Sequence, residues 1–200
     1  MTQPRRSPRG PDRKRDPERT RERLLEAALV EFGEHGYAGA RISAIARRAG
    51  VNQQLISYYF DGKEGLFKAL QSRWRDTSAQ ANDPGRGLAD VVAEFLRINA
   101  DNRPWARMLI WGGLADSTPD DEPFFLGMVD DLRRRQEAGE ISADLDPAHL
   151  MLLLFGAVLA PTVVPHVARQ FTGLDPESDE FRETYAAQLR LVIARLGEPG

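Results

Sequence analysis

The sequence predicts an all-α protein with about nine helices and no sheet. Apolar residues recur at helical spacing along most of the chain, and no convincing stretch alternates between apolar and polar side chains. Capping residues, prolines and glycines stand at the ends of the periodic segments. With 200 residues, 42% of them apolar, the chain is long enough for one domain of typical size and a small second one.

The charge is distributed unevenly between the front and the rear of the chain. Residues 1–75 carry 16 Lys and Arg against nine Asp and Glu, whereas residues 76–200 carry 11 against 21. The net charge of -3 therefore hides a basic front, and only the front is expected to meet a polyanion such as DNA. Residues 1–15 are predicted to form a disordered basic arm, which is either a solvated tail or a DNA contact.

The first helix is expected to begin at Asp16-Pro17, where an N-cap residue precedes a proline. Its apolar stripe has the spacing i, i+3, i+4, i+7, and Gly36 ends it. The stripe consists of Leu25, Ala28, Leu29 and Phe32.

Three further helices are expected in the front part. The stripe Ile42, Ile45, Ala46 and Ala49 predicts the second, and Gly50 stops it. Asn52 is expected to cap a short third helix that runs to about Tyr59. Asp61 and Glu64 predict a capping box at the start of the fourth helix. The apolar residues of that helix are Leu66, Phe67, Leu70 and Trp74.

Five helices are expected beyond the break near residues 82–87, at 88–101, 104–115, 119–138, 147–171 and 177–196. Asn102-Arg103-Pro104, Thr118-Pro119, Asp146-Pro147 and Asp175-Pro176 mark their starts, and Gly139 and Gly173 mark stops. Pro161 and Pro165 are expected to kink or break the helix 147–171.

Residues 42–60 have the pattern of a helix-turn-helix. This motif needs a small residue where its helices touch, a glycine in the turn and apolar anchors on its second helix. Ala46, Gly50 and Val51 meet the first requirements, and Ile56 and Phe60 serve as anchors. The alternative, a polar face between two core helices, does not explain the charge distribution.

With these anchors inward, the polar face of the second helix of the motif points outward. It carries Gln53, Gln54, Ser57 and Tyr58, with Asn52 at its start, and these groups suit base edges and phosphates. Lys63 is expected to supply a phosphate site at the start of the fourth helix. Tyr59 either reaches a phosphate or completes the core.

Composition argues against several other classes of protein. The chain has no cysteine, and its three histidines form no metal-ligand pair at helical spacing, so neither a metal site nor a cofactor is expected. It has no G-x-S-x-G, H-E-x-x-H, Walker or Rossmann motif, so no catalytic residue and no enzyme activity are expected. Residues 148–168 are uncharged and long enough to span a membrane, but their two prolines favour a buried helix of a dimer instead.

The run from Leu24 to Leu70 resembles the DNA-binding domain of the TetR family of transcriptional regulators. Its matching motifs are F-x-x-x-G-Y from Phe32, I-A-x-x-A-G-V from Ile45, and Y-Y-F followed by K-E-x-L from Tyr58. The resemblance implies DNA contacts at Arg41, Ser43, Asn52, Gln53, Gln54, Ser57, Tyr58, Tyr59 and Lys63. The sequence departs from the family pattern at Ala40 and Arg41, where a Ser or Thr that caps the helix is common. It also departs at Gln54, where the family commonly has a small residue, and at Ser57, where it frequently has a tyrosine.

The resemblance also implies the organisation of the whole chain. Residues 16–65 would form the helix-turn-helix domain, and residues 66–200 a larger domain that binds an effector and dimerises through the last two helices. The protein is then a cytoplasmic, ligand-responsive regulator, by family default a repressor, that binds a palindromic operator in double-stranded DNA as a homodimer. A helical small-molecule carrier and an architectural DNA binder are the alternatives.

The effector pocket is expected to be apolar. Large side chains in the rear domain supply adaptable apolar surface, although each of them also suits a plain core position. The pattern does not allow any buried charged group to be predicted, so we expect a small, largely apolar effector. The predicted lining residues are Trp105, Met108, Trp111, Phe125, Met128 and Phe155.

Overall fold

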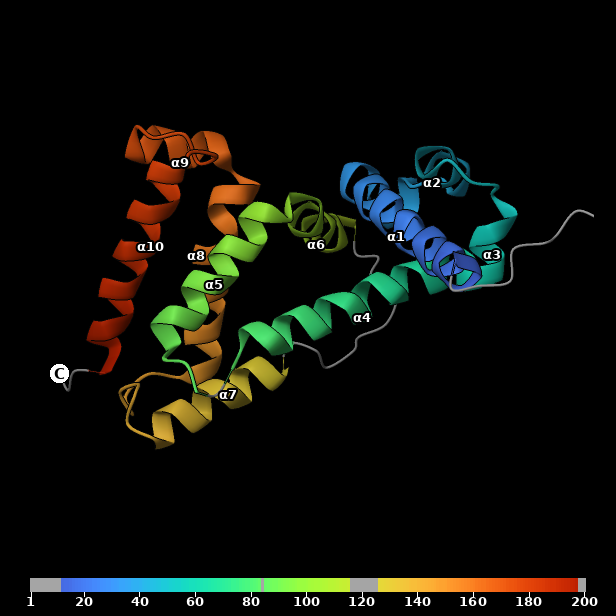
Figure 1. Cartoon of the computed structure of the whole chain (residues 1–200). Coiled ribbons are helices and arrows are strands. Elements are labelled where there is room, and N and C mark those ends of the chain that lie inside the picture. Colours follow the sequence, from blue (N-terminus) through green and yellow to red (C-terminus); the bar gives the residue numbers. More distant parts are fainter. Residues whose placement is uncertain (1–11, 84, 116–125, 198–200) are drawn as a thin grey trace, which may run out of the picture.

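The computed structural model describes residues 12–83, 85–115 and 126–197, and these contain ten α-helices and no strand (Figure 1). The all-α prediction is confirmed. The described part of the chain ends with a short 3-10 turn, Arg195–Gly197. The helices are α1 Asp12–Gly39, α2 Ile42–Ala49, α3 Gln54–Phe60, α4 Lys63–Ala81, α5 Leu88–Asp101, α6 Arg103–Ala115, α7 Leu126–Glu137, α8 Pro147–Val163, α9 Pro165–Thr172 and α10 Asp179–Ala194.

The tenth helix arises from the break that the two prolines predict. Val164 has φ -124° and ψ 59°, which is not helical, and α8 and α9 meet there at 96°. Pro165 lacks the N–H that would continue the helix, and its ring disfavours a helical conformation at the residue before it. No single helix among the described residues is long and apolar enough to cross a membrane. Helices α8 and α9 reach that length and composition only when taken together, and the pair is sharply bent.

The front domain packs α1, α2, α3 and the first half of α4 around one apolar core. The predicted stripes face inward, because Leu25, Ala28, Ile45 and Leu66 are all buried. Aromatic rings fill the centre of this core, where Phe32 and Phe67 meet edge to face with centroids 5.2 Å apart. Gly36, at φ 67°, ends the first straight run of α1, as predicted.

Two helix starts in this domain differ from the prediction. Helix α1 begins at Asp12, so Pro17 lies inside it and residues 12–15 are helical rather than part of a disordered arm. Pro17 has no N–H, so α1 lacks one intrahelical hydrogen bond near its start. Residues 1–11 of the predicted arm lie outside the described part of the chain. The capping box at Asp61 does not form, because Asp61 adopts φ 58° and ends α3.

The rear helices confirm one predicted cap and correct another. Asp146 Oδ1 accepts a hydrogen bond from the backbone N–H of His149 at 2.9 Å and begins α8 as expected. Asp175 instead caps a turn, and Ser178 Oγ caps α10 by accepting from the N–H of Phe181 at 3.2 Å. The start predicted at Thr118-Pro119 lies outside the described residues.

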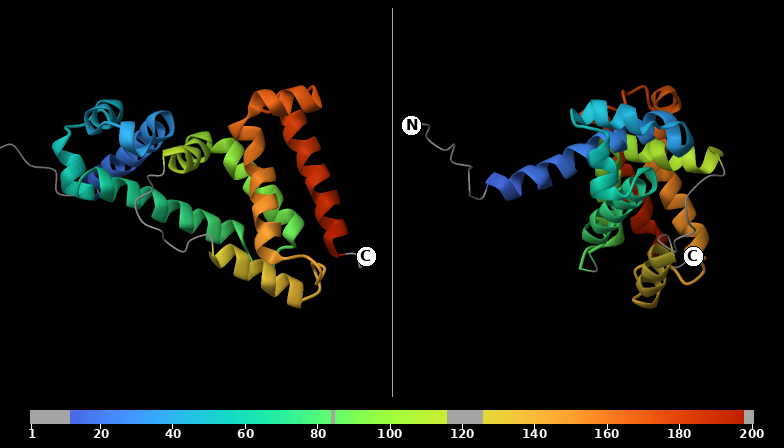
Figure 2. Two further views of the ribbon diagram at one scale, coloured as in Figure 1. Left: turned by 180° about the vertical axis from the view of Figure 1, so that it is seen from behind. Right: turned by 90° about the vertical axis from the view of Figure 1, so that its right-hand side faces the viewer.

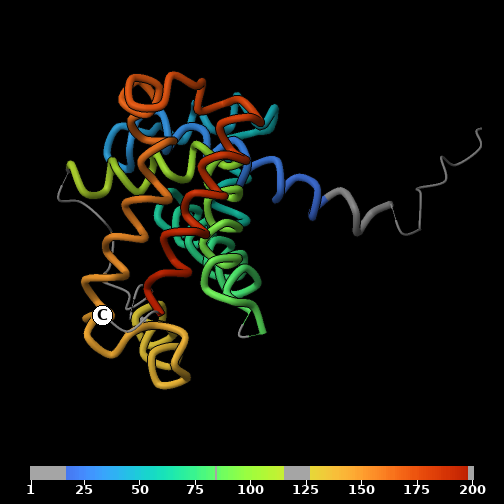
Figure 3. Tube along the Cα trace, turned by 90° about the vertical axis from the view of Figure 1, so that its left-hand side faces the viewer, coloured from blue at the N-terminus to red at the C-terminus, as the bar shows by residue number. Residues whose placement is uncertain are grey.

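The rear domain is built around α5, which packs against both α8 and α10, while α7 lies at the lower end of α8 (Figures 2 and 3). Its core includes Leu88, Leu132, Leu154 and Leu189. The hydroxyl of Tyr185 on α10 donates to the carbonyl of Ala157 on α8 at 2.9 Å and joins these two helices. Helix α4 runs from the front domain to the rear one, and α6 packs across α1 (Figure 1).

Candidate nucleic-acid interface and effector cavity

The turn between α2 and α3 has the geometry that a helix-turn-helix requires. Gly50 adopts φ 64° and ψ 39°, a left-handed conformation that favours glycine. A Cβ atom at this position would lie 2.7 Å from Nη2 of Arg23. The N–H of Val51 then bonds to the carbonyl of Ala46 at 3.0 Å and closes the turn.

The anchors of α3 are buried as the pattern predicts. Ile56 is fully buried and Phe60 is 6% exposed, while Val51 packs against the same core. The guanidinium of Arg21 lies 4.7 Å from the centre of the Phe60 ring, where it makes a cation–π contact. The opposite side of α3 is therefore free to face solvent.

The outward face of α3 is polar and exposed. Tyr58 is 78% exposed, so its ring is a protruding group and not part of the core. Asn52 Oδ1 accepts a hydrogen bond from the N–H of Gln54 at 2.9 Å, which fixes the start of the helix as predicted. The structure exposes Asn52, Gln53, Gln54, Ser57 and Tyr58 together on this face.

Tyr59 and Lys63 are held more firmly by the protein. Tyr59 is half-buried and packs against the front core, with its ring 5.0 Å from that of Tyr58. Lys63 Nζ donates to the carbonyl of Ala38 at 3.3 Å and lies 4.8 Å from the centre of the Tyr37 ring. Burial lowers the pKa of Lys63, and the nearby Glu31 carboxylate partly offsets this.

The start of α2 is capped by a residue that sequence reasoning missed. Arg41 and Ser43 are exposed there, and the Arg41 side chain makes no cap. Instead, Glu31 Oε1 accepts from the backbone N–H of Arg41 at 3.2 Å, although Glu31 is only 4% exposed. A signal was available, because Leu24, Ala27, Ala28 and Glu31 have the spacing i, i+3, i+4, i+7 of a buried face.

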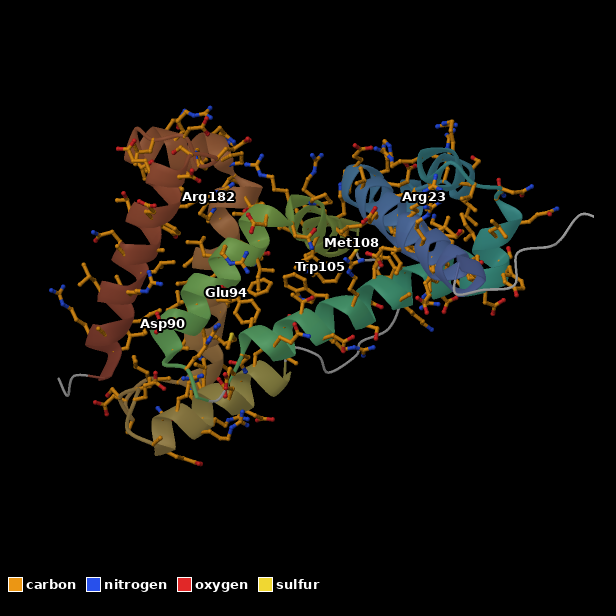
Figure 4. The ribbon with its side chains drawn as sticks, viewed as in Figure 1. Arg23, Asp90, Glu94, Trp105, Met108 and Arg182 are labelled. Atoms are coloured by element: carbon orange, nitrogen blue, oxygen red, sulfur yellow. The ribbon has the colours of Figure 1, made fainter. Side chains whose placement is uncertain are left out.

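Further basic groups border this face. Arg47 and Arg48 are exposed in the last turn of α2, and Arg48 Nη2 pairs with Glu34 Oε2 at 2.9 Å. Arg23 of α1 approaches the turn at Gly50 (Figure 4). Exposed arginines suit phosphate oxygens.

Glu31, Glu34 and His35 bring their ligand atoms within 4.8 Å of one another. Two of the three already have cationic or backbone partners: Glu31 holds the Arg41 N–H and Glu34 holds Arg48. The cluster is explained by the packing of α1 against α2, and we assign no metal to it.

A largely apolar cavity of about 70 Å³ lies inside the rear domain. Two of the predicted pocket residues, Met128 and Phe155, line it. Most of the other lining residues come from α4, α5 and α8. They include Trp74, Leu88, Val92, Phe95, Met151, Leu154 and Leu159, and Leu109 of α6 also lines the cavity.

The structure places the other predicted pocket residues elsewhere. Trp105 and Met108, each 4% exposed, point from α6 into the core shared with α1 and α4 (Figure 4). Trp111 is 39% exposed and packs against Gly36. All three were expected in the pocket because residue type alone does not say which face of α6 meets α1. Phe125 lies outside the described residues.

The cavity also has polar groups that the pattern did not reveal. Asn82, Asn99 and Asp131 line it, and Asn99 is 3% exposed. The Asp131 carboxylate is paired with Nε of the buried Arg135 at 2.7 Å and with Nη2 of Arg134 at 2.8 Å. The sequence pattern did not reveal this buried ion pair.

Helices α8 and α10 expose apolar side chains that a single chain does not cover. On α8, Leu152 and Leu153 are 69% and 71% exposed, and on α10, Leu191 and Val192 are 54% and 56% exposed. The uncharged stretch predicts that α8 is buried on all sides. Such burial requires another protein surface to cover these exposed side chains. We call these four residues the α8–α10 face.

Residues 24–70 match the family model described as bacterial regulatory proteins, tetR family. The HTH-type transcriptional repressor SCO4008 of Streptomyces coelicolor is 30% identical over 189 residues, which cover 90% of this chain and 98% of that protein. The crystal structure of the transcriptional regulator SCO4942, also from Streptomyces coelicolor, is 26% identical and has a TM-score of 0.69, covering 87% of this chain and 96% of that one. HlyIIR, a hemolysin II transcriptional regulator, shares the fold at 21% identity, with a TM-score of 0.58 over 92% of this chain and 99% of its own.

The similarity to SCO4008 spans both domains, whereas the family model covers only the front one. A carrier without DNA binding does not fit relatives of this kind. Members of the family bind operator DNA and act as dimers. The chain belongs to the TetR family and is a DNA-binding transcriptional regulator, not an enzyme.

Proposed function

We propose that the protein is a repressor that binds a palindromic operator as a dimer and leaves it when a small molecule enters the rear cavity. The relative SCO4008, which matches over nearly its whole length, is named a repressor, and this favours the same sign of regulation here. Each part of the proposal has a separate structural basis.

In the DNA complex, α3 lies in the major groove. Gln53, directly before α3, and Gln54 and Tyr58 on it are the exposed candidates for base edges, because a glutamine amide pairs with adenine and none of these three side chains carries a charge. Arg41 and Ser43 at the start of α2 and Asn52 and Ser57 beside the base-reading residues are candidates for phosphates. Tyr59 and Lys63 keep one side in the protein, and their remaining polar atoms are candidates for the DNA backbone.

In the dimer, the α8–α10 face covers its copy on the second subunit. A two-fold axis makes such a contact self-complementary, and it buries four large side chains that water now surrounds. Two copies of α3 then read half-sites about 34–36 Å apart, one turn of DNA.

The proposed coupling between effector binding and DNA binding is supported by one observation: α4 contributes residues to both domains. Its first half places Leu66, Phe67 and Leu70 in the front core, directly after the recognition helix. Further along, Trp74 lines the rear cavity. A ligand that displaces Trp74 therefore acts on the helix that positions α3, and a typical coupling between such sites is about 1–3 kcal/mol, or roughly 5–150-fold in affinity.

The direct test is a mobility-shift titration on DNA from the promoter beside the protein's own gene. We expect a sequence-selective shift, and we expect Tyr58→Ala to weaken it at least about tenfold with an unchanged melting temperature, because Tyr58 is mostly exposed. Gln80→Ala, at an exposed position on α4, is the matched control and keeps the wild-type affinity. Equal affinities for operator and unrelated DNA would contradict the proposal.

The dimer is tested separately by sedimentation. Leu153→Arg places a charge on the α8–α10 face and is expected to shift the protein toward the monomer and to weaken operator binding. Leu114→Arg on α6 is the control, because Leu114 is equally exposed, at 75%, but lies outside this face. If both variants remain dimers, the second subunit docks elsewhere.

A further inference from the structure

An open groove of about 360 Å³ lies on the surface of the rear domain, between α6 and the corner where α8 meets α9. Its volume is several times that of the interior cavity. It also falls within the usual range of about 300–1,000 Å³ for small-molecule sites. We call it the α6 groove, because most of its lining residues come from that helix.

One arginine gives the α6 groove an uncompensated charge. Arg107 is exposed, and its guanidinium forms no ion pair or hydrogen bond with any residue that the structure describes. Arg103 lies one turn earlier on α6 and also lines the groove, but its charge is paired with Glu177. None of the described lining residues is acidic. The groove therefore offers a cation to a ligand that carries a negative charge.

The surface beyond Arg107 is apolar. Residues 107, 111 and 114 share one side of α6, because they are separated by four and then three positions. Trp111 is 39% exposed and Leu114 is 75% exposed, and Val163 and Pro165 form the facing wall. At a rise of 1.5 Å per residue, Leu114 lies about 10 Å along the helix from Arg107. The groove thus has a charged end and an apolar end.

Helix α6 lies between this groove and the front domain. It packs against both α1 and α8 (Figure 1). On the side of α6 away from the groove, Trp105 and Met108 are buried in the front core, and the backbone of Pro104 lies close to Gly33 of α1. A molecule in the groove therefore contacts a helix that supports α1, without entering the interior cavity.

We infer that the α6 groove is a second small-molecule site, and that it binds a free amphipathic carboxylate. The carboxylate pairs with the guanidinium of Arg107, while an apolar tail covers Trp111 and Leu114. A neutral molecule of the same shape gains only the apolar contact, and a cation is repelled by Arg107. The inference goes beyond the proposed function, which assigns the effector to the interior cavity.

The experiment titrates the full-length protein without DNA by calorimetry at neutral pH, using octanoate, octanol and octylammonium. We expect octanoate to bind about three- to fivefold more tightly than octanol, as an exposed charge pair allows, and octylammonium to bind most weakly. Equal binding of octanoate and octanol would overturn the inference. Tighter binding of octylammonium, or no binding of octanoate below the concentration at which it forms micelles, would do the same.

Variants assign the preference to the groove. Arg107→Gln is expected to lower the affinity for octanoate to that for octanol and to leave octanol binding unchanged. Leu114→Ser removes apolar surface and should weaken both probes alike. Arg195→Gln, at an exposed arginine outside the groove, is the matched control and keeps the preference. A preference for octanoate that survives Arg107→Gln would place the anion elsewhere and refute the assignment.

Tryptophan fluorescence locates the tail. The chain has three tryptophans, and of these Trp111 lines the groove, whereas Trp74 and Trp105 stack on each other in the interior. Octanoate is expected to change the fluorescence of the wild-type protein. Trp111→Phe should bind octanoate with similar affinity and lose this signal. The same change of fluorescence in Trp111→Phe would place the ligand beside the interior pair and contradict a site in the groove.

These outcomes are distinguishable from failure of the proposed function. Probe binding is measured without DNA, whereas operator binding is measured by the mobility shift without probe. A selective operator shift together with equal binding of octanoate and octanol would leave the repressor intact and remove only the site at Arg107.

Discussion

Trp74 and Trp105 stack face to face, with ring centroids 4.7 Å apart and planes inclined by 19°. Trp74 comes from α4 and lines the rear cavity, while Trp105 comes from α6 and is buried in the core shared with the front domain. The stack therefore joins the helix that follows the recognition helix to the helix that packs on α1. A ligand beside Trp74 has two contiguous routes to the DNA-binding surface.

Removing one ring of this stack is expected to destabilise the protein. Trp105→Ala should lower the free energy of unfolding by about 3–5 kcal/mol, the usual cost of deleting a large buried aromatic side chain. Trp111→Ala, on the same helix but 39% exposed, should cost less than half as much. Urea unfolding of both variants measures the difference. Equal losses of unfolding free energy would mean that the stacked position of Trp105 adds no stability beyond that of the more exposed Trp111.

The close contact of α1 with α6 gives a second prediction. A Cβ atom at Gly33 would lie 2.6 Å from the carbonyl oxygen and 2.9 Å from Cα of Pro104, both backbone atoms. Gly33→Ala is therefore expected to push the helices apart and to lower the free energy of unfolding by about 1–3 kcal/mol. Gly113→Ala on α6 has nothing within 4 Å of the new Cβ and should be neutral or slightly stabilising. Equal stabilities of these two variants would exclude a tight α1–α6 contact.

The carboxylate of Glu31 is expected to matter for DNA binding although it does not face the DNA. It caps α2 through the N–H of Arg41, and Glu31→Ala leaves this N–H unpaired, at a cost of about 1–2 kcal/mol. Glu31→Gln keeps an acceptor oxygen and should retain most of the stability and the operator affinity. Thermal unfolding and mobility shifts test the pair, and a Gln variant as damaged as the Ala variant would contradict the capping role.

The cap of α8 predicts a pH dependence. The N–H of His149, and then its side chain, hold the pKa of Asp146 below its ordinary value of 3.8. A carboxyl group with a lowered pKa stabilises the folded state above that ordinary value, and this contribution is lost as the pH falls through the lowered pKa. Asp146→Ala should remove this dependence below about pH 4 while leaving the protein folded at pH 7. Chemical unfolding at pH 3 and pH 7 shows the effect, and identical pH profiles of the two proteins would refute it.

The front domain could be predicted from the sequence because its signals are local. Gly50 at φ 64° and the buried Ile56 and Phe60 follow from a spacing of a few residues, and so does the break at Pro165. Prediction failed at two helix starts. Asp61 adopts a left-handed conformation and ends α3 instead of capping α4, and Ser178 rather than Asp175 caps α10.

The rear cavity could be predicted only in part, because its residues come from helices far apart in the sequence. Met128 and Phe155 were found by residue type, but Trp105 and Met108 face the other side of α6. Asn99 and the Asp131–Arg135 pair were missed since polar residues on amphipathic helices usually face water. Only the packing of α4, α5, α7 and α8 turns them inward.

The most direct test of the central claim is a hydroxyl-radical footprint of the wild-type protein on DNA from its own promoter. We expect two protected half-sites related by a two-fold axis, with centres about one turn of DNA apart. Protection of one half-site, or of DNA without sequence preference, would contradict the account of two recognition helices set one turn apart by the α8–α10 face.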